Sequence, residues 1–226
     1  MSLPTQPELQ SSKNLRQFLS EKFKEIILRG DNVITLTSNL SGIFDRVTSP
    51  NEFTGPLVEA WAHIHLAKIL ENYNSAAARE QEFADARAEY QGQSVLLNIK
   101  AKDREMNARS RINLSSFQRY KTHYSQPNPP AFYVMLFEYE WRPQGNQLWI
   151  IIEKLKYAFN LLEIPVGHYK IEGAFEGSHR IFISPIPESA KTESTTYSII
   201  TPSQFLQRLE ELREAYVARK GSRARK

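Results

Sequence analysis

The sequence predicts an α/β (α+β) fold, with a mixed central β-sheet flanked by helices. Three observations predict it. Residues 84–102 alternate between apolar and polar side chains on both sides of a glycine turn, which is typical of two half-buried strands. Residues 131–141 are too apolar for an edge strand and are expected in the middle of a sheet. Segments of helical periodicity come before, between and after these strands, an order that indicates helices packed on a mixed sheet.

The chain before residue 84 is expected to hold two helices and one strand. Apolar side chains recur at helical spacing from Leu15 to Ile27, and Ser12 is a suitable cap. The segment that begins at Thr54-Gly-Pro is apolar on most sides, so it is expected to be a largely buried helix. The expected elements are a loose leader at 1–11, a helix at 12–28, a strand at 33–36, a loop at 39–51, a helix from 54 to about 72 and a polar connector at 72–82.

The chain after residue 102 is expected to continue with further strands and two or three helices. Asn128-Pro-Pro breaks the chain before the apolar strand, and Arg142-Pro-Gln-Gly-Asn is expected to form a turn. Thr201-Pro202 is a suitable start for a final helix. The expected elements are a basic loop, a short helix at 114–124, strands at 131–141 and 147–152, a short helix at 153–162, a hairpin of 169–175 and 180–186, and a helix from 201 to about 219.

Length and composition favour one domain. The chain has 226 residues, of which 41% are hydrophobic, enough to bury a core of its own. It contains no cysteine, which excludes disulfides, thiolate zinc sites and a cysteine nucleophile. No run of about 18 apolar residues and no secretory signal pattern is present. We therefore expect a single cytoplasmic domain, 1–226, without a membrane segment and with a flexible basic tail at 219–226.

The turn at Gln91-Gly92 decides the register of the hairpin. If these two residues form the turn, with the glycine at positive φ, Asp85 falls opposite Asn98. Lys100 is two residues further along and lies on the same face. A longer loop would move the register, and a one-residue slip would put Asp85 on the other face. The two-residue turn therefore predicts that an acid, an amide oxygen and a lysine converge on one face of the sheet.

A family resemblance follows from these residues. A helix with an internal acid, then Asp85, then a strand with Asn98-Ile99-Lys100, followed by a polar loop, a helix and an apolar strand, resembles the PD-(D/E)xK nucleases. The compact layout, over about residues 54–141, is similar to that of type II restriction endonucleases. The resemblance implies a restriction-endonuclease-like fold, in which Asp85 is the first metal-binding carboxylate and Lys100 is the catalytic lysine.

Asn98 is the main departure from the family pattern, which usually has Asp or Glu there. An amide oxygen can bind Mg²⁺ but brings no charge. Glu59 is the candidate replacement, since the resembling family often brings a helix glutamate to the metal. On this interpretation Asp85, Asn98 and Glu59 hold Mg²⁺, and Lys100 orients the attacking water or stabilises the charge of the transition state. Alternatively, Glu59 only complements the helix dipole, and Asp85 forms an ordinary surface ion pair with Lys100.

A basic segment follows the lysine strand. Its Lys and Arg side chains can bind phosphates, and its asparagines can read adenine edges. A flexible, solvated loop is the alternative interpretation. The expected DNA-binding residues are Lys102, Arg104, Asn107, Arg109, Arg111 and Asn113.

The functional hypothesis is a type II restriction endonuclease. Such an enzyme hydrolyses phosphodiester bonds of double-stranded DNA with Mg²⁺, and a homodimer would cut both strands of a palindromic site. The resemblance also implies a cognate DNA methyltransferase in a restriction-modification system. A non-catalytic DNA-binding relative of the same fold and a structure-specific repair or junction nuclease are the alternatives.

Overall fold

A six-stranded mixed sheet forms the centre of the computed structural model, which describes residues 6–40, 43–44, 51–75, 84–104, 111–175, 178–194 and 198–223. The strand order is β1-β7-β6-β4-β3-β2, in which β4 and β6 are parallel and the other neighbours are antiparallel. The strands are β1 (Val33–Thr37), β2 (Glu71–Asn74), β3 (Ala86–Tyr90), β4 (Gln93–Asp103), β6 (Ala131–Gln144) and β7 (Gln147–Asn160). The mixed α/β architecture that the sequence predicted is confirmed.

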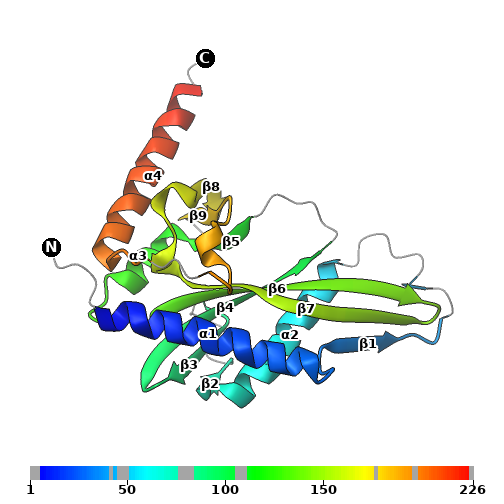
Figure 1. Cartoon of the computed structure of the whole chain (residues 1–226). Coiled ribbons are helices and arrows are strands. Elements are labelled where there is room, and N and C mark those ends of the chain that lie inside the picture. Colours follow the sequence, from blue (N-terminus) through cyan, green and yellow to red (C-terminus); the bar gives the residue numbers. More distant parts are fainter. Residues whose placement is uncertain are drawn as a thin grey trace.

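Two helices, α1 (Gln6–Leu28) and α2 (Asn51–Ile69), cover one side of this sheet, which curls around them (Figure 1). The apolar stripe of α1 and the side of α2 that carries Val58, Trp61 and Leu66 are buried against the strands. The expected burial of α2 on most sides holds for this side only, because Ile64 is 58% exposed. This first core includes Leu15, Leu19, Phe23, Val58, Trp61, Leu66, Leu97 and Phe137. None of the helices in the described part of the chain is long and apolar enough to cross a membrane.

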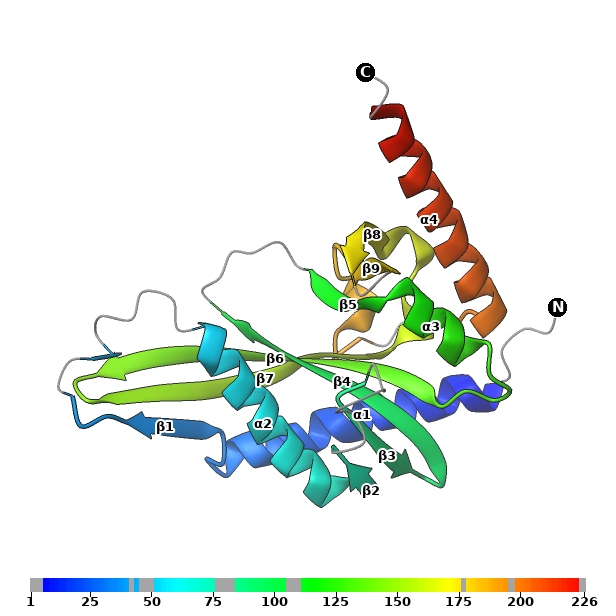
Figure 2. The ribbon, with the colours of Figure 1, turned by 180° about the vertical axis from the view of Figure 1, so that it is seen from behind.

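A second layer covers part of the opposite side of the sheet. It consists of a three-stranded sheet in the order β5-β9-β8 with helices α3 and α4, and Figures 1 and 2 show α4 projecting away from it. The elements are β5 (Ile112–Ser116), α3 (Phe117–Tyr124), β8 (Tyr169–Phe175), β9 (Ser178–Ile183) and α4 (Pro202–Arg223). The second core includes Leu96, Phe132, Val134, Phe159, Tyr169 and Phe205.

Several segments differ from their expected structure. α1 begins at Gln6, so residues 6–11 are helical and are not a loose leader. The connector after α2 contains β2, and the basic segment leads into β5, so α3 starts only at Phe117. The prediction of a helix at 153–162 was wrong for most of this segment, because residues 153–160 continue β7 along β6 and pack both faces of the strand in hydrophobic cores. Only the last two residues are helical, in a 3-10 turn at Leu161–Glu163.

Candidate active site

The β3–β4 hairpin has the register that its turn predicted. Gln91 and Gly92 have φ angles of 51° and 73°, the left-handed values of a two-residue type I′ turn. The register pairs Ala86 with Leu97. Asp85, the residue before Ala86, therefore lies opposite Asn98, the residue after Leu97. The sheet therefore brings the predicted acid beside the predicted lysine strand.

The candidate site forms where β3 ends and β4 continues. Because β3 begins at Ala86, the edge N–H groups of β4 beyond this point need acceptors other than a strand. Asp85 supplies the first acceptor, since its Oδ2 accepts a hydrogen bond of 2.6 Å from the N–H of Ile99. The Nζ of Lys100 lies 3.5 Å from the same oxygen, and the Lys100 and Asp85 side chains are 31% and 33% exposed. Solvent and a substrate can therefore reach both groups.

Glu59 supplies the next acceptor along this edge, from α2, which lies beside β4 (Figure 2). Its carboxylate accepts a hydrogen bond from the N–H of Ala101, two residues after the N–H that Asp85 accepts. Burial raises the pKa of Glu59, Lys100 opposes this rise, and the Asp85 carboxylate adds to it. Residues two apart on a strand are separated by about 6.7 Å. Two carboxylates and a lysine therefore share one site.

The position of Glu59 within α2 bears on its role. Pro56 suggested a helix start that would put Glu59 in the first turn, but α2 begins at Asn51. Helix dipole effects fall off within the first turn. The dipole interpretation of Glu59 therefore loses its basis, and its contacts are those of the candidate site.

Asn98 lies on β4 two residues before Lys100 and is buried, with 7% exposure. Its Oδ1 atom has no hydrogen-bond partner within the described part of the chain. A buried acceptor without a partner costs about 1–3 kcal/mol, so it is uncommon in a native core. Such an atom, which the hairpin register places opposite Asp85, is a suitable ligand for a cation.

The oxygen atoms of the site suit a small hard cation. Mg²⁺ is usually held by one or two carboxylates, and water and substrate phosphates supply the other ligands. Asp85 and Glu59 offer two carboxylates, and Asn98 offers a neutral oxygen. Across the described ranges, no group of three or more His, Cys, Asp or Glu side chains gathers around a possible metal position. A Mg²⁺ ion bound here would therefore depend on the two carboxylates and the amide.

Two residues that sequence reasoning missed flank the site. His63 lies one turn after Glu59 on α2, and its Nδ1 is hydrogen-bonded to the hydroxyl group of Tyr73 on β2. Burial lowers the pKa of His63, the Asp85 carboxylate opposes this, and Lys100 adds to it. Burial also raises the pKa of Tyr73, and Asp85 adds to that rise. His63 could have been found from the sequence, because residues four apart on a helix lie on the same face as each other, here with Glu59. Tyr73 could not, because it is brought to the site by β2, a strand that was not predicted.

The residues expected to bind DNA fall into three groups. Lys102 follows Lys100 on the same face of β4, and Arg104 comes directly after the end of this strand. Nη1 of Arg104 donates to Oε1 of Glu153 at 2.5 Å. Residues 105–110, which include Asn107 and Arg109, lie outside the described residues. Of these residues, only Lys102 and Arg104 are therefore seen to extend from the candidate site.

Arg111 and Asn113 form the third group and lie on β5, in the second sheet. The Arg111 guanidinium donates two hydrogen bonds to the Glu172 carboxylate, at 2.7 and 2.5 Å, and a third to Oδ1 of Asn113 at 2.8 Å. It also stacks on the Phe182 ring, 4.0 Å from the centroid. A phosphate would therefore have to compete with Glu172 for this guanidinium.

Comparison with known proteins supports the fold. No family model matches the chain, and no curated protein matches its sequence. Among solved structures it is similar to NlaIV restriction endonuclease, with a TM-score of 0.50 and 13% identity over 85% of this chain and 78% of that chain. The chain has a restriction-endonuclease-like fold. The fold that the sequence resemblance implied is thus confirmed, and it extends well beyond the segment on which the resemblance was based.

Proposed function

We propose that this chain is a Mg²⁺-dependent type II restriction endonuclease, which hydrolyses phosphodiester bonds at a specific site in double-stranded DNA. The observation that carries the proposal is the meeting of Asp85, Lys100 and Glu59 at one edge of β4, within a restriction-endonuclease-like fold. A surface ion pair alone would not need the second carboxylate, nor the buried amide oxygen two residues away.

Each residue has a role that its position allows. Mg²⁺, when bound, would neutralise phosphate charge and lower the pKa of a coordinated water. Asp85 and Glu59 would hold the ion, with Oδ1 of Asn98 as a further ligand. The Ile99 N–H fixes the Asp85 carboxylate. Lys100 is placed to orient the attacking water and to stabilise the charge that develops on the phosphoryl oxygens.

The proposal extends to the partners of the chain. A homodimer would place two sites on the two strands of a palindromic sequence. Lys102 and Arg104, with Asn107, Arg109, Arg111 and Asn113, are the proposed DNA-binding residues. A cognate DNA methyltransferase and a cytoplasmic location belong to the same proposal.

A second candidate function is a non-catalytic DNA-binding protein of the same fold. The observation that favours it is Asn98, because the site has one carboxylate fewer on β4 than the family pattern. A nuclease specific for branched DNA is the third candidate, and it would use the same site on a different substrate.

Incubation with phage DNA tests the three candidates. Wild type is expected to produce discrete fragments with Mg²⁺ and none with EDTA. Asp85→Asn keeps an oxygen that can accept the Ile99 N–H but loses the charge, so cleavage should fall by at least about 100-fold, and Lys100→Ala should do the same. Glu89→Gln is the matched control, because it removes a carboxylate from β3 of the same hairpin, and it should cut normally. Full cleavage by Asp85→Asn would remove Asp85 from catalysis.

Two other results would favour the rival functions. Binding without cleavage of any substrate would favour the non-catalytic protein. Cleavage confined to branched DNA would favour the structure-specific nuclease.

A further inference from the structure

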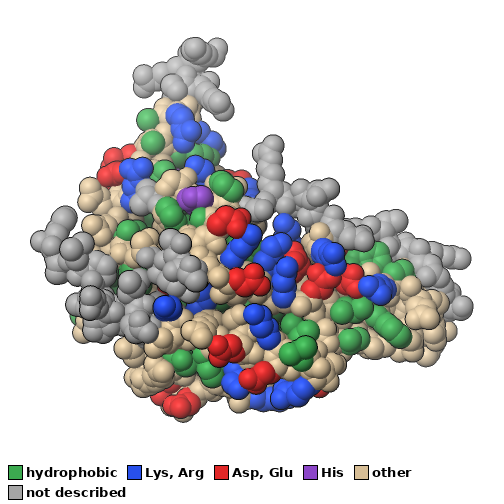
Figure 3. Space-filling view, in the orientation of Figure 1, with side chains coloured by type: hydrophobic (Ala, Val, Ile, Leu, Met, Phe, Trp, Pro, Cys, Tyr) green, Lys and Arg blue, Asp and Glu red, His purple; other side chains and the backbone are tan. Residues whose placement is uncertain are grey.

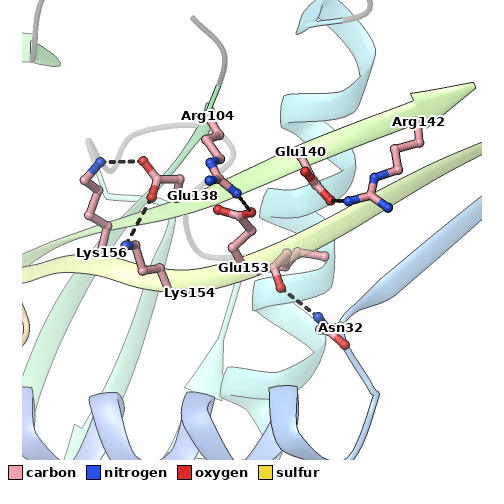
Figure 4. Close-up of polar contacts among 9 residues, drawn as sticks. Asn32, Arg104, Glu138, Glu140, Arg142, Glu153, Lys154 and Lys156 are labelled. Atoms are coloured by element: carbon pink, nitrogen blue, oxygen red, sulfur yellow. Dashed lines mark hydrogen bonds and ion pairs between the residues drawn. The ribbon is translucent and has the colours of Figure 1, made fainter.

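The second layer leaves part of one sheet face open. It packs on β6 and β7 around residues 132–136 and 157–159. Further along these strands the same face carries charged side chains, and Figure 4 shows them along β6 and β7 with α2 behind the strands. Figure 3 shows basic and acidic side chains side by side over this region. The charged residues labelled in Figure 4 are Arg104, Glu138, Glu140, Arg142, Glu153, Lys154 and Lys156.

Two irregularities in β7 place Lys154 and Lys156 on this open face. The β6–β7 register shifts twice, opposite residues 136–139. Each shift gives β7 one extra residue, as in a β-bulge, so two successive side chains stay on one side of the sheet. Ile152 and Leu155 both pack in the first core, and the two residues between them lie on the outer side. β-Bulges are over-represented next to active sites, where they re-aim side chains.

Glu138, Lys154 and Lys156 form what we call the Glu138 cluster. Oε2 of Glu138 lies 3.4 Å from Nζ of Lys154, and its Oε1 accepts a hydrogen bond from Lys156. The Glu138 side chain is 9% exposed, whereas that of Lys154 is 55% exposed. Burial acts to raise the pKa of Glu138, but Lys156 and Lys154 lower it below its ordinary value, so the carboxylate stays ionised at neutral pH. One carboxylate thus holds two ammonium groups, and the cluster keeps one net positive charge.

The Glu138 cluster lies close to the candidate active site. The β4–β6 register sets Glu138 beside Lys102, which is two residues after Lys100 on the same face of β4. Two residues along a strand correspond to about 6.7 Å. A DNA strand carries one phosphate per 3.4 Å of helix axis. Lys154 and Lys156 are on β7, two strands from β4, and neighbouring strands are about 4.8 Å apart, so the cluster lies roughly 12 Å from Lys100 across the sheet. A phosphate a few nucleotides from the phosphate at the candidate site would therefore reach the cluster.

We propose that the Glu138 cluster binds a backbone phosphate of DNA, a few nucleotides from the phosphate that is cut. This inference rests on the proposed nuclease function. A phosphate would neutralise the one positive charge that Glu138 leaves unbalanced. The buried Glu138 carboxylate keeps the two ammonium groups at fixed positions. Contacts with phosphate position the duplex and read no bases, so the cluster sets the placement of the cleaved bond.

Lys154→Gln tests the inference. The variant leaves Glu138 paired with Lys156, so no buried carboxylate loses its last partner, and the net charge of the cluster becomes zero. Binding to a duplex of about 20 base pairs is measured by fluorescence anisotropy, in EDTA to prevent cleavage and over a series of KCl concentrations. Loss of one phosphate contact should reduce the slope of log K against log salt by about 0.9 in magnitude.

Two variants complete the test. Lys154→Arg keeps the charge and should restore the wild-type slope. Lys22→Gln removes a lysine that pairs with Glu25 on α1, at 38% exposure, and should leave the slope unchanged. A wild-type slope in Lys154→Gln, or an equal loss in Lys22→Gln, would overturn the inference.

Cleavage of phage DNA by the same wild-type preparation separates the two proposals. If wild type cuts DNA and the Lys154→Gln slope equals that of wild type, only the cluster inference fails. If wild type does not cut but Lys154→Gln loses slope, the nuclease proposal fails and the phosphate contact stands.

Discussion

Replacing Asn98 by Asp restores the carboxylate that the family pattern has at this position. The hairpin register puts the new carboxylate opposite Asp85, and directly opposed Cβ atoms are about 5 Å apart. At an effective dielectric constant of about 20, two unit charges at this distance repel by about 3 kcal/mol. The Asp85 side chain is 33% exposed, so solvent screens part of this energy. We expect metal-free Asn98→Asp to be about 1–3 kcal/mol less stable than wild type, with a Tm about 2–10 °C lower.

Mg²⁺ should offset part of this loss. A ligand that binds only the folded state stabilises it by RT ln(1 + [L]/Kd), which is about 2.7 kcal/mol when its concentration is 100-fold above Kd. An additional anionic ligand in the site lowers the Kd for a divalent cation. The rise in Tm caused by Mg²⁺ should therefore be larger in Asn98→Asp than in wild type.

Thermal melts followed by circular dichroism, in EDTA and in Mg²⁺, measure both effects. Asn146→Asp is the matched control, because it adds the same charge in the exposed β6–β7 turn and should change neither value. Equal melting temperatures of Asn98→Asp and wild type in EDTA would refute the proximity of the two side chains. Equal Mg²⁺ shifts in the two proteins would refute a cation site at Asn98.

Three further changes test the candidate site and its support. Because the folded-state pKa of Glu59 is raised, its contribution to stability is present below the unfolded pKa and lost as pH rises. Metal-free Glu59→Gln should therefore resist urea better than wild type at pH 7, with a difference that shrinks as the pH falls through the raised pKa and is gone below the unfolded pKa of about 4.3. Gly92→Ala should cost about 1–2 kcal/mol in urea unfolding, because φ is 73°, whereas Gly92→Asn should cost less. Arg16→Ala leaves buried Glu163 without its ion-pair partner and should lower the free energy of unfolding by about 3–5 kcal/mol; a loss below about 1 kcal/mol would contradict this.

The hairpin could be predicted from the sequence because its determinants are local. A glycine-containing two-residue turn and the alternation on both sides of it fix the register without help from distant elements. The contact between Asp85 and Lys100 follows from that register alone. The presence of α2 and its contribution to the first core could be predicted for a similar reason, since its apolar residues lie within one continuous segment.

Features that depend on how separate elements meet could not be predicted in the same way. The register shifts in β7 leave successive residues on one side of the strand, so residues 153–160 lack the alternation by which a strand is recognised. The contacts of Glu59 depend on where α2 crosses β4, and the true start of α2 lies in front of the proline that suggested its beginning. Tyr73 reaches the site through β2, whose four residues carry too little pattern to predict a strand.

The early end of β3 gives a physical reason for hydrogen-bond acceptors at the candidate site. It leaves the N–H groups of Ile99 and Ala101 without a strand partner, and Asp85 and Glu59 accept them. An amide oxygen would also accept such hydrogen bonds, although more weakly than a carboxylate, and without the cost of burying charge. The sheet therefore requires acceptors at these positions but not negative charge. The packing alone therefore does not account for two carboxylates here, whereas the proposed Mg²⁺ site would use both of them, together with the Asn98 oxygen that lies opposite Asp85.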